Sequence, residues 1–351
     1  MQDNTYNRHL IKKGSSIKDA LEQLDILAKD AIVFVVSYDN KLIGSLTDGD
    51  VRRGLLKGFS VNNSVDDIIQ PFPRFIRKGE KNIYKIIELR ENNFRIIPVL
   101  DKNDRIINVI NFRELKSYLP VDAVIMAGGR GERLKPLTDF TPKPLLKVGD
   151  KPILEYNIDR MRLFGIDDFW ITLRYLGDQI ETYFGDGNGR NINVQYVKEL
   201  QPLGTIGAVS KITNFQHDYV LVTNSDLLTN LNYEQFFLDF LKQNADLAVV
   251  TIPYKVSVPY AVLETSNGHI VDFKEKPTYT YYSNGGIYLM KKDVLGLIPK
   301  NTFYNATDLM EGLINQNRKV ISYPLQGYWL DVGKPEDFEK ANKDFERINF
   351  D

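Results

Sequence analysis

The chain has 351 residues and 45 Lys+Arg against 46 Asp+Glu, a formal net charge of -1. This length predicts about two domains, and the balanced charge disfavours a nucleic-acid-binding protein, which would be basic. The absence of cysteine excludes disulfides, thiolate metal sites and a cysteine nucleophile. Because we find no signal-peptide core and no apolar run of membrane-spanning length, we expect a cytoplasmic protein without a membrane partner.

Two similar units occupy the first third of the chain. The elements predicted for the first are a helix at 17–29, strands at 31–36 and 41–46, and a capped helix at 47–56. Those predicted for the second are a helix at 81–92, strands at 95–100 and 105–110, and a helix led by 111–114. The two hairpin turns are about 63 residues apart, so we predict an internal repeat whose halves share one core.

The order of predicted elements changes after Pro120, where strands begin to alternate with helices. Strands are predicted at 121–126, 168–173, 191–197 and 219–223, and helices at 153–164, 176–184 and near 205–212. Such alternation predicts a mostly parallel sheet covered on both faces. The strand-rich sequence after Asp246 predicts an antiparallel extension. We therefore predict an α/β fold with two domains, residues 1–119 and 120–351.

A glycine-rich loop follows the strand at 121–126 directly. Gly128, Gly129 and Gly131 allow close approach of the backbone to a ligand, and bare N–H groups in such a turn bind anions. Between residues 126 and 148, five basic residues outnumber two acidic ones, and two prolines flank Lys143. The spacing is neither the Walker pattern nor G-x-G-x-x-G. The loop therefore predicts a phosphate site of another kind, with an unliganded structural turn as the alternative.

Together with later segments, this loop resembles the signature of the sugar-1-phosphate nucleotidylyltransferases. The matching segments are 127–138 with 142–145, 199–205, 224–226, 273–277, 284–288 and 329–333. The resemblance covers residues 121–346 and implies a Rossmann-like (GT-A-like) mixed sheet covered by helices. It implies transfer of a nucleotidyl group from NTP to a sugar 1-phosphate, with release of pyrophosphate. Glu132 departs from the pattern, because many members carry a small hydroxyl residue there.

The resemblance also assigns roles to individual positions. It implies that Arg133 and Lys143 are catalytic, and that Asp226 and Asp331 hold Mg²⁺, with Mn²⁺ as the alternative. The implied nucleotide-binding residues are Ala127, Gly128, Gly129, Arg130, Gly131, Glu132, Gly204 and Thr205. The implied sugar-phosphate-binding residues are Glu199, Glu275, Lys276, Asn284 and Gly286. Outside this pattern, an isolated aspartate is more often a cap, and Glu275 with Lys276 more often a surface ion pair.

The segment 44–50 resembles a CBS repeat, and this resemblance covers about residues 8–118. It implies an α+β CBS pair, with repeats at about 8–58 and 64–118, that binds a regulatory nucleotide through Thr47 and Asp50. A plain helix N-cap is the alternative for these two residues. The second repeat departs from the pattern at Asn111 and Glu114, so we expect at most one nucleotide site. CBS pairs often dimerise, so we expect a homo-oligomer.

The leading hypothesis is a guanylyltransferase of bacterial surface-sugar synthesis. The arrangement resembles the mannose-1-phosphate enzymes and the glucosamine-1-phosphate enzymes of legionaminic acid synthesis, so GTP is the expected nucleotide. The alternatives are a uridylyl- or thymidylyltransferase acting on glucose 1-phosphate, and a nucleotide-sensing protein with an inactive transferase domain. A glycosyltransferase is disfavoured, because segment 224–226 has one acid. This chemistry needs no histidine base, and we predict that His9, His217 and His269 are solvated.

Overall fold

The computed structural model describes residues 5–80 and 82–345, and the chain divides into two compact units. The first unit is Met1–Pro120 together with Arg162–Asp168 and Gly185–Val194. The second unit is Val121–Met161, Phe169–Phe184 and Gln195–Asp351. The first unit therefore takes in two segments from later in the chain.

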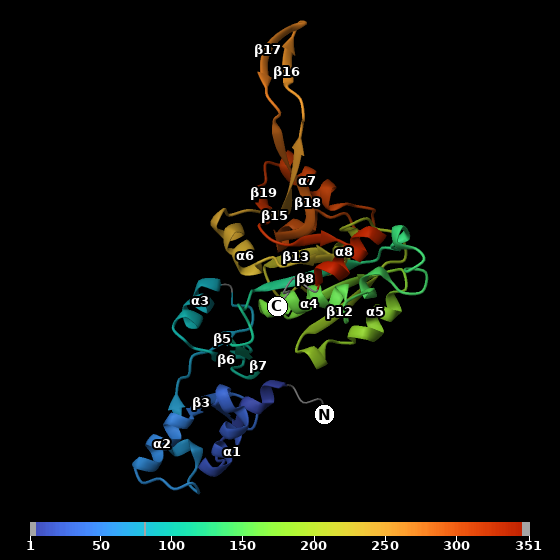
Figure 1. Cartoon of the computed structure of the whole chain (residues 1–351). Helices are drawn as coiled ribbons and strands as arrows, with labels where there is room; N and C mark the ends of the chain where they lie inside the picture. The colour runs from blue at the N-terminus through green and yellow to red at the C-terminus, as the bar shows by residue number, and fades with distance from the viewer. Residues whose placement is uncertain (1–4, 81, 346–351) are drawn as a thin grey trace. The chain divides into compact units, whose positions relative to one another are not determined.

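Two repeats of one topology form most of the first unit (Figure 1). The elements of the first repeat are β1 (Leu10–Lys12), α1 (Ile17–Leu27), β2 (Ile32–Val36), β3 (Leu42–Thr47) and α2 (Asp48–Leu56). Those of the second are β5 (Ile76–Arg77), α3 (Ile83–Glu91), β6 (Ile96–Leu100) and β7 (Ile106–Asn111), and β4 (Gln70–Pro71) lies between the repeats in sequence. In each repeat the first strand pairs parallel with the second, which pairs antiparallel with the third. The predicted internal repeat is confirmed.

The hairpins of the two repeats meet at their turns. Leu42 N donates to Asp104 O at 3.0 Å, and Ile106 N donates to Asn40 O at 3.0 Å. One buried cluster draws on both hairpins through Phe34, Val36, Leu100 and Ile106. The halves share a core, as predicted, since a two- or three-stranded sheet alone has little to bury its apolar face against.

The helix predicted from residues 111–114 onward is wrong, since the structure gives turns and irregular backbone over 112–120. Asn111 Oδ1 accepts a hydrogen bond from Arg113 N at 2.9 Å, which is a local turn that competes with helix formation. Asn111 Nδ2 also donates to the buried Asp30 Oδ2 at 2.9 Å. These two bonds fix Asn111 in the core of the first unit.

The second unit is built on a seven-stranded sheet of order β12-β11-β8-β13-β18-β15-β19. Its strands are β8 (Val121–Ala127), β11 (Asp168–Leu173), β12 (Asn193–Lys198), β13 (Tyr219–Asn224), β15 (Leu247–Ser257), β18 (Thr278–Lys291) and β19 (Val320–Pro324). β8 and β13 run parallel, and β18 is antiparallel to both its neighbours, β13 and β15. The mixed α/β sheet with an antiparallel extension is confirmed.

Helices accompany this sheet and bury both of its faces. They are α4 (Ile153–Leu163), α5 (Gly177–Phe184), α6 (Tyr233–Lys242), α7 (Ala306–Asn315) and α8 (Pro335–Phe345). Along β13, Val220 and Val222 join one core cluster with Leu309 of α7. Leu221 lies between them, is 1% exposed and points to the opposite face. Burial on both faces explains why β13 has a continuous apolar run.

The α-helix predicted near 205–212 is wrong, because this segment forms the 3-10 helix η7 (Gly207–Lys211). Ile206 N and Gly207 N both donate to Tyr304 O at 3.1 Å, so their bonds leave the segment. Further short elements are η1 (Thr5–His9), η2 (Ala28–Asp30), η3 (Val65–Asp67), η4 (Glu132–Leu134), η5 (Lys143–Leu145), η6 (Asn188–Arg190), η8 (Lys292–Leu297), β9 (Lys147–Val148), β10 (Lys151–Pro152), β14 (Leu227–Thr229) and β20 (Trp329–Asp331).

A long two-stranded arm, residues 253–284, projects from the sheet of the second unit (Figure 1). The outer halves of β15 and β18 form its stem. The antiparallel pair β16 (Val262–Ser266) and β17 (His269–Lys274) forms its tip. In the described part of the chain, every arm residue is exposed or half-buried, and none is buried.

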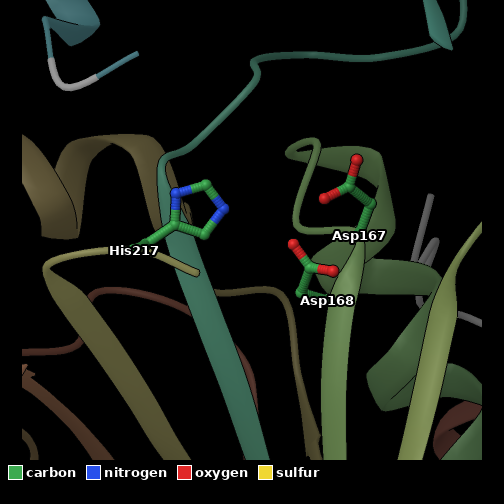
Figure 2. Close-up of side chains that lie close together, drawn as sticks. All are labelled: Asp167, Asp168 and His217. Carbon is green, nitrogen blue, oxygen red and sulfur yellow. The ribbon is translucent and has the colours of Figure 1, made fainter. Parts of the chain in front are cut away.

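Figure 2 shows Asp167 and Asp168 where β11 begins. Both residues belong to the first unit. Lys78 Nζ lies 3.2 Å from Asp167 Oδ1 and 2.7 Å from Asp168 Oδ2. Tyr118 Oη donates to Asp167 Oδ2 at 3.1 Å. Burial opposes the charge on Lys78, but the two carboxylates outweigh it and raise the pKa of Lys78. Both carboxylates thus have a partner among the side chains of their own unit.

Two of the three histidines are buried, contrary to the prediction that all are solvated. His9 is 2% exposed, with Nδ1 at 2.9 Å from Ile32 O, and burial lowers the pKa of His9. His217, also labelled in Figure 2, is 7% exposed, and its backbone N donates to Asp122 Oδ2 at 2.7 Å. His269 is exposed on the arm, as predicted.

No helix within residues 5–80 and 82–345 combines the length and the hydropathy required to span a bilayer.

Candidate active site

The glycine-rich loop and the segment 224–226 lie at one edge of the sheet. β8 and β13 pair in parallel, and Met126 is the register partner of Asn224. The residues that follow each strand, Gly128 and Asp226, therefore leave the sheet side by side. The carboxyl edge of parallel strands is where open α/β sheets bind ligands.

The glycine loop is shaped by contacts that a side chain would disturb. Gly131 has φ +64°, and a Cβ added there would lie 3.0 Å from Thr138 Cγ2. Thr138 Oγ1 closes the turn by donating to Gly131 O at 2.9 Å. A Cβ on Gly128 would lie 2.8 Å from Glu199 Oε1, whereas a Cβ on Gly129 would meet nothing within 4 Å. The α-carbon of Gly129 therefore faces open space, where a ligand could approach the backbone of the loop.

Lys143 and two aspartates converge beside this loop. The ammonium of Lys143, whose side chain is 10% exposed, forms an ion pair with Asp226 and lies 3.9 Å from Asp331 Oδ1. The two aspartates are brought together by the antiparallel pair β14–β20, in which Leu227 is the register partner of Asp331. Val332 N also donates to Asp226 O at 3.0 Å. A small sheet thus joins residues that are far apart in sequence.

The donor set of this cluster fits a hard divalent cation. Asp226 Oδ1 and Asp331 Oδ1 are buried and accept no hydrogen bond from any described residue. Burial raises the pKa of Asp331, the Asp226 charge raises it further, and Lys143 and Arg133 oppose the shift. Two carboxylate oxygens that accept no hydrogen bond from the described residues are the kind of ligand that Mg²⁺ takes in proteins.

A pocket of about 330 Å³ opens beside Lys143 and Asp226. Glu199 forms one wall, and its Oε2 accepts a hydrogen bond from Leu203 N at 3.3 Å. Burial raises the pKa of Glu199 above its ordinary value. The next wall is the turn at 203–205, where Thr205 Oγ1 accepts a hydrogen bond from Ala306 N at 2.9 Å. Glu199 and the turn at 203–205 therefore line the same pocket as Lys143 and Asp226.

Residues 122–348 match the family model described as nucleotidyl transferase. The chain belongs to this family. The match confirms the predicted family for the second part of the chain, which contains the pocket. The family model does not cover the two N-terminal repeats, for which the CBS resemblance stays a prediction.

Curated nucleotidyl transferases from bacteria are similar to this chain over about the same region. The D-glycero-alpha-D-manno-heptose 1-phosphate guanylyltransferase of Aneurinibacillus thermoaerophilus is 30% identical over 231 residues, 64% of this chain and 99% of that protein. The mannose-1-phosphate guanylyltransferase of Mycobacterium tuberculosis is 32% identical over 236 residues, 65% of each protein. A solved structure assigned as a glucose-1-phosphate thymidylyltransferase from Bacillus anthracis has a TM-score of 0.52 at 24% identity. It covers 66% of this chain and 97% of its own, and shows the fold alone.

The nucleotidyl transferase pocket brings together about half of the residues that the sequence singles out. Those that line it are Gly128, Gly129, Lys143, Glu199, Gly204, Thr205 and Asp226. Asp331 adjoins it through Lys143, and Gly286 adjoins it because a Cβ there would lie 2.6 Å from Asn224 Nδ2. Ala127 is buried at the end of β8.

Other predicted residues lie outside the lining. Arg133 is exposed and packs near Gly333, where an added Cβ would lie 3.3 Å from its guanidinium. Arg130 is exposed with its guanidinium carbon 5.8 Å from the Tyr175 ring centroid, and Glu132 is exposed. Asn284 Nδ2 donates to Tyr288 Oη at 2.8 Å. Glu275 and Lys276 are exposed on the arm.

Among the lining residues that the sequence reasoning did not assign to the site are Thr172, Arg174, Asn224 and Phe303. Arg174 Nε donates to Gly128 O at 3.2 Å and so fixes the start of the glycine loop. The sequence feature that could have identified Arg174 is its position directly after β11, at the same edge of the sheet as Gly128 and Asp226. Asn224 stands in a segment that was singled out for Asp226 alone. No sequence pattern pointed to Phe303, because it lies in an irregular segment that joins the pocket only in the folded chain.

In the first unit, Thr47 and Asp50 form a capping box at the start of α2. Asp50 Oδ2 accepts from Thr47 N at 2.9 Å and from Thr47 Oγ1 at 2.6 Å. Asp50 Oδ1 accepts from Gln70 Nε2 at 2.9 Å and from Arg53. Asp50 is 5% exposed. The N-cap role is therefore filled in this structure, and the ligand role stays a prediction.

Proposed function

We propose that this nucleotidyl transferase is a sugar-1-phosphate guanylyltransferase, which joins GTP and a sugar 1-phosphate to give a GDP-sugar and pyrophosphate. The observation that carries this proposal is the cluster of Lys143, Asp226 and Asp331 beside the glycine loop. Two carboxylates beside the pocket could hold a divalent cation, and that cation together with the buried ammonium of Lys143 would offset the repulsion between two phosphate groups. The family match and the two guanylyltransferase relatives support it.

The reaction proceeds by in-line attack of a phosphate oxygen of the sugar 1-phosphate on the α-phosphorus of the nucleotide. A new oxygen–phosphorus bond forms, the bond from the α-phosphorus to the bridging oxygen breaks, and pyrophosphate leaves. The attacking oxygen is already ionised at neutral pH, so no general base is needed. Lys143 and the loop N–H groups offset charge as the two anions approach. Arg174 holds Gly128 O, which keeps the loop in position.

We also propose that Asp226 and Asp331 hold Mg²⁺, with Mn²⁺ as an alternative. Their two buried oxygens without a hydrogen-bond partner in the described residues support this assignment. The bound ion supplies charge neutralisation between the phosphate groups. Lys143 neutralises Asp226 in the structure, and with the substrates bound it is positioned to contact their phosphates instead.

The choice of GTP rests on the two guanylyltransferase relatives, which are about 30% identical. For the sugar, we propose a mannose-, heptose- or glucosamine-type 1-phosphate for surface glycan or legionaminic-acid-type synthesis. The nucleoside triphosphate is a cytoplasmic metabolite, so we place the reaction in the cytoplasm. The alternative is uridylyl or thymidylyl transfer to glucose 1-phosphate.

The test is pyrophosphate release with Mg²⁺, each of GTP, UTP, dTTP, ATP and CTP, and a panel of sugar 1-phosphates. We expect release with GTP and one of the mannose, heptose or glucosamine 1-phosphates. Preferred use of UTP or dTTP with glucose 1-phosphate would select the alternative. A protein that binds nucleotides but releases no pyrophosphate with any pair would be an inactive, nucleotide-sensing member.

For the first unit, we propose a CBS-type regulatory module that binds a nucleotide near Thr47 and Asp50 and pairs with a second copy. The strand–helix–strand–strand order of both repeats and their shared core support this proposal. The test is calorimetric titration of adenine and guanine nucleotides with the active site saturated. Asp50→Asn should weaken this binding, and equal binding by variant and wild type would refute the assignment.

A further inference from the structure

Arg174 can donate more hydrogen bonds than its contact with the glycine loop uses. The residue follows β11 directly, is half-buried and lines the pocket. Its Nε donates to Gly128 O at 3.2 Å. A guanidinium has five N–H donors in one plane, and no described residue accepts a hydrogen bond from the two Nη atoms of Arg174. These donors are therefore available to a molecule in the pocket.

A carboxylate lies next to this guanidinium. A Cβ added to Gly128 would lie 2.8 Å from Glu199 Oε1 and 3.6 Å from Arg174 Cβ, so both side chains border the same glycine. Burial raises the pKa of Glu199, and the charge of Arg174 is one of the effects that oppose this shift. Because the carboxylate repels phosphate, this part of the pocket favours a neutral group that offers both acceptors and donors.

The order of the strands places Arg174 away from the phosphate cluster. β11, β8 and β13 are consecutive in the sheet, and they lead into Arg174, the glycine loop and Asp226 respectively. Neighbouring strands are about 4.8 Å apart, so the backbone at Arg174 lies roughly 10 Å from that at Asp226. A nucleotide whose α-phosphate lies at Lys143 and Asp226 therefore crosses the glycine loop and presents its base to Arg174.

Guanine is the base that fits this pair of side chains. Its O6 and N7 are neighbouring acceptors, which an arginine contacts with two parallel hydrogen bonds. Its N1–H and N2–H₂ donors continue the same edge of the ring and suit the carboxylate of Glu199. Adenine and cytosine place an amino group where guanine has O6, and in uracil and thymine the acceptor O4 is followed by a carbon. Each of these bases would leave donors of Arg174 without an acceptor.

We propose that Arg174 is the residue that selects guanine, by donating from its two Nη atoms to O6 and N7 of the base. Its Nε stays on Gly128 O, so the same side chain fixes the loop and reads the base. This inference rests on the proposed guanylyl transfer, for which it supplies a structural basis.

Nucleotide analogues separate reading of the base from support of the loop. ITP keeps O6 and N7 but lacks the N2 amino group, and 2-aminopurine riboside triphosphate lacks O6. Arg174→Gln should lower kcat/KM for GTP and ITP by the same factor, roughly 10- to 100-fold, and for the 2-aminopurine nucleotide by a much smaller factor. Pyrophosphate release measures all three. Equal losses for the three nucleotides would overturn the proposal, because a displaced loop would impair each of them alike.

Arg174→Lys tests whether the planar shape of the group is needed. Lysine keeps the charge but not the fork that makes two parallel hydrogen bonds, so this variant should lose the preference for O6-bearing nucleotides as Arg174→Gln does. Full wild-type preference in Arg174→Lys would show that charge alone is used. Arg95→Gln, at an exposed arginine of the first unit, is the matched control that should keep wild-type rates with every nucleotide.

Calorimetric titration with GTP and UTP in the absence of sugar 1-phosphate gives a second readout without turnover. We expect tighter binding of GTP by the wild type and a loss of most of this difference in Arg174→Gln. A wild-type protein that prefers UTP or dTTP would refute the proposed guanylyl transfer itself. A wild-type preference for GTP that persists unchanged in Arg174→Gln would refute only the role of Arg174.

Discussion

At the scale of single residues, charge neutralisation decides what the candidate site can do. Lys143 is buried, and Asp226 is its ion-pair partner. Burying a lone ammonium is costly unless a carboxylate pairs with it. One carboxylate oxygen of Asp226 and one of Asp331 nevertheless accept no hydrogen bond from the described residues. The residues that neutralise one another in the pocket are therefore those that would receive a cation and phosphates.

We predict that Asp226→Asn and Asp331→Asn each lower the rate of pyrophosphate release by at least about 100-fold. The amide keeps the shape of the side chain but removes the charge that a divalent cation requires. Circular dichroism and thermal melting should show that the fold is retained. Asp178→Asn is the control, because Asp178 is an exposed acid that pairs with Lys198. Wild-type turnover in either site variant would contradict the metal assignment.

A second carboxylate, outside the site, gives a prediction about pH and stability. Asp246 accepts hydrogen bonds from Arg318 at 2.9 Å, from Lys319 N at 2.9 Å and from Lys291 at 3.1 Å. The hydrogen bond from Arg318 is the main reason that the pKa of Asp246 lies below its ordinary value. Because the folded pKa is lowered, this stabilisation is present at neutral pH and is lost as pH falls below the ordinary carboxyl range.

We predict that Asp246→Asn lowers the free energy of unfolding by about 2 kcal/mol at pH 7. The difference from the wild type should shrink as pH is lowered from about 5 to about 2, because protonated Asp246 and the amide become equivalent. Urea unfolding of both proteins across this range measures it. A difference that does not change with pH would show that Asp246 contributes through packing and not through its charge.

At the scale of elements, the turns that follow β8 and precede η7 position the site. Gly204 has φ +76°, and a Cβ there would lie 2.5 Å from Tyr304 O. Gly129 has no atom near the corresponding position. The fold therefore requires glycine at position 204. At position 129, only the close approach of a bound ligand would require glycine.

We predict opposite outcomes for alanine at these two positions. Gly204→Ala should lower the melting temperature, because the added methyl group meets backbone that cannot move freely. Gly129→Ala should change the free energy of unfolding by less than about 0.5 kcal/mol but raise KM for the nucleotide several-fold. Steady-state kinetics and melting curves of both variants measure this. An unchanged KM for Gly129→Ala would remove Gly129 from the nucleotide site.

At the scale of the whole molecule, the division into units does not follow the order of the chain. Residues 162–168 and 185–194 belong to the unit of the N-terminal repeats. Lys116 N donates to Leu163 O at 2.7 Å, and Leu119 N donates to Phe164 O at 3.1 Å. A family match over 122–348 therefore includes segments that complete the first unit.

We predict that a fragment of residues 120–351 melts at a lower temperature than the full chain. Its Asp167 and Asp168 would lose Lys78, their partner in the first unit, and the largely buried segment 162–168 would become more exposed. Lys78→Met in the full chain isolates the charge contribution and should cost less than the truncation. Differential scanning calorimetry measures both, and equal melting temperatures would show that these segments are stable by themselves.

The sequence by itself determined the repeat, the family of the second part and several residues of the pocket lining. These follow from local patterns: hydrophobic periodicity, the glycine loop, and short motifs at strand ends such as Asn224–Asp226. The errors arose where backbone hydrogen bonds leave the local segment. Tyr304 O holds η7 from about 97 residues away, and Asn111 turns toward Asp30.

Only the tertiary structure decided which of the motifs meet. The pairing of β14 with β20 places Asp331 beside Asp226, across about 105 residues of sequence. The extension of β15 and β18 into a ribbon carries Lys276 away from the pocket that its motif predicts. Strand register and the direction of a long hairpin depend on the cumulative packing of the sheet, and that packing leaves no local pattern in the sequence.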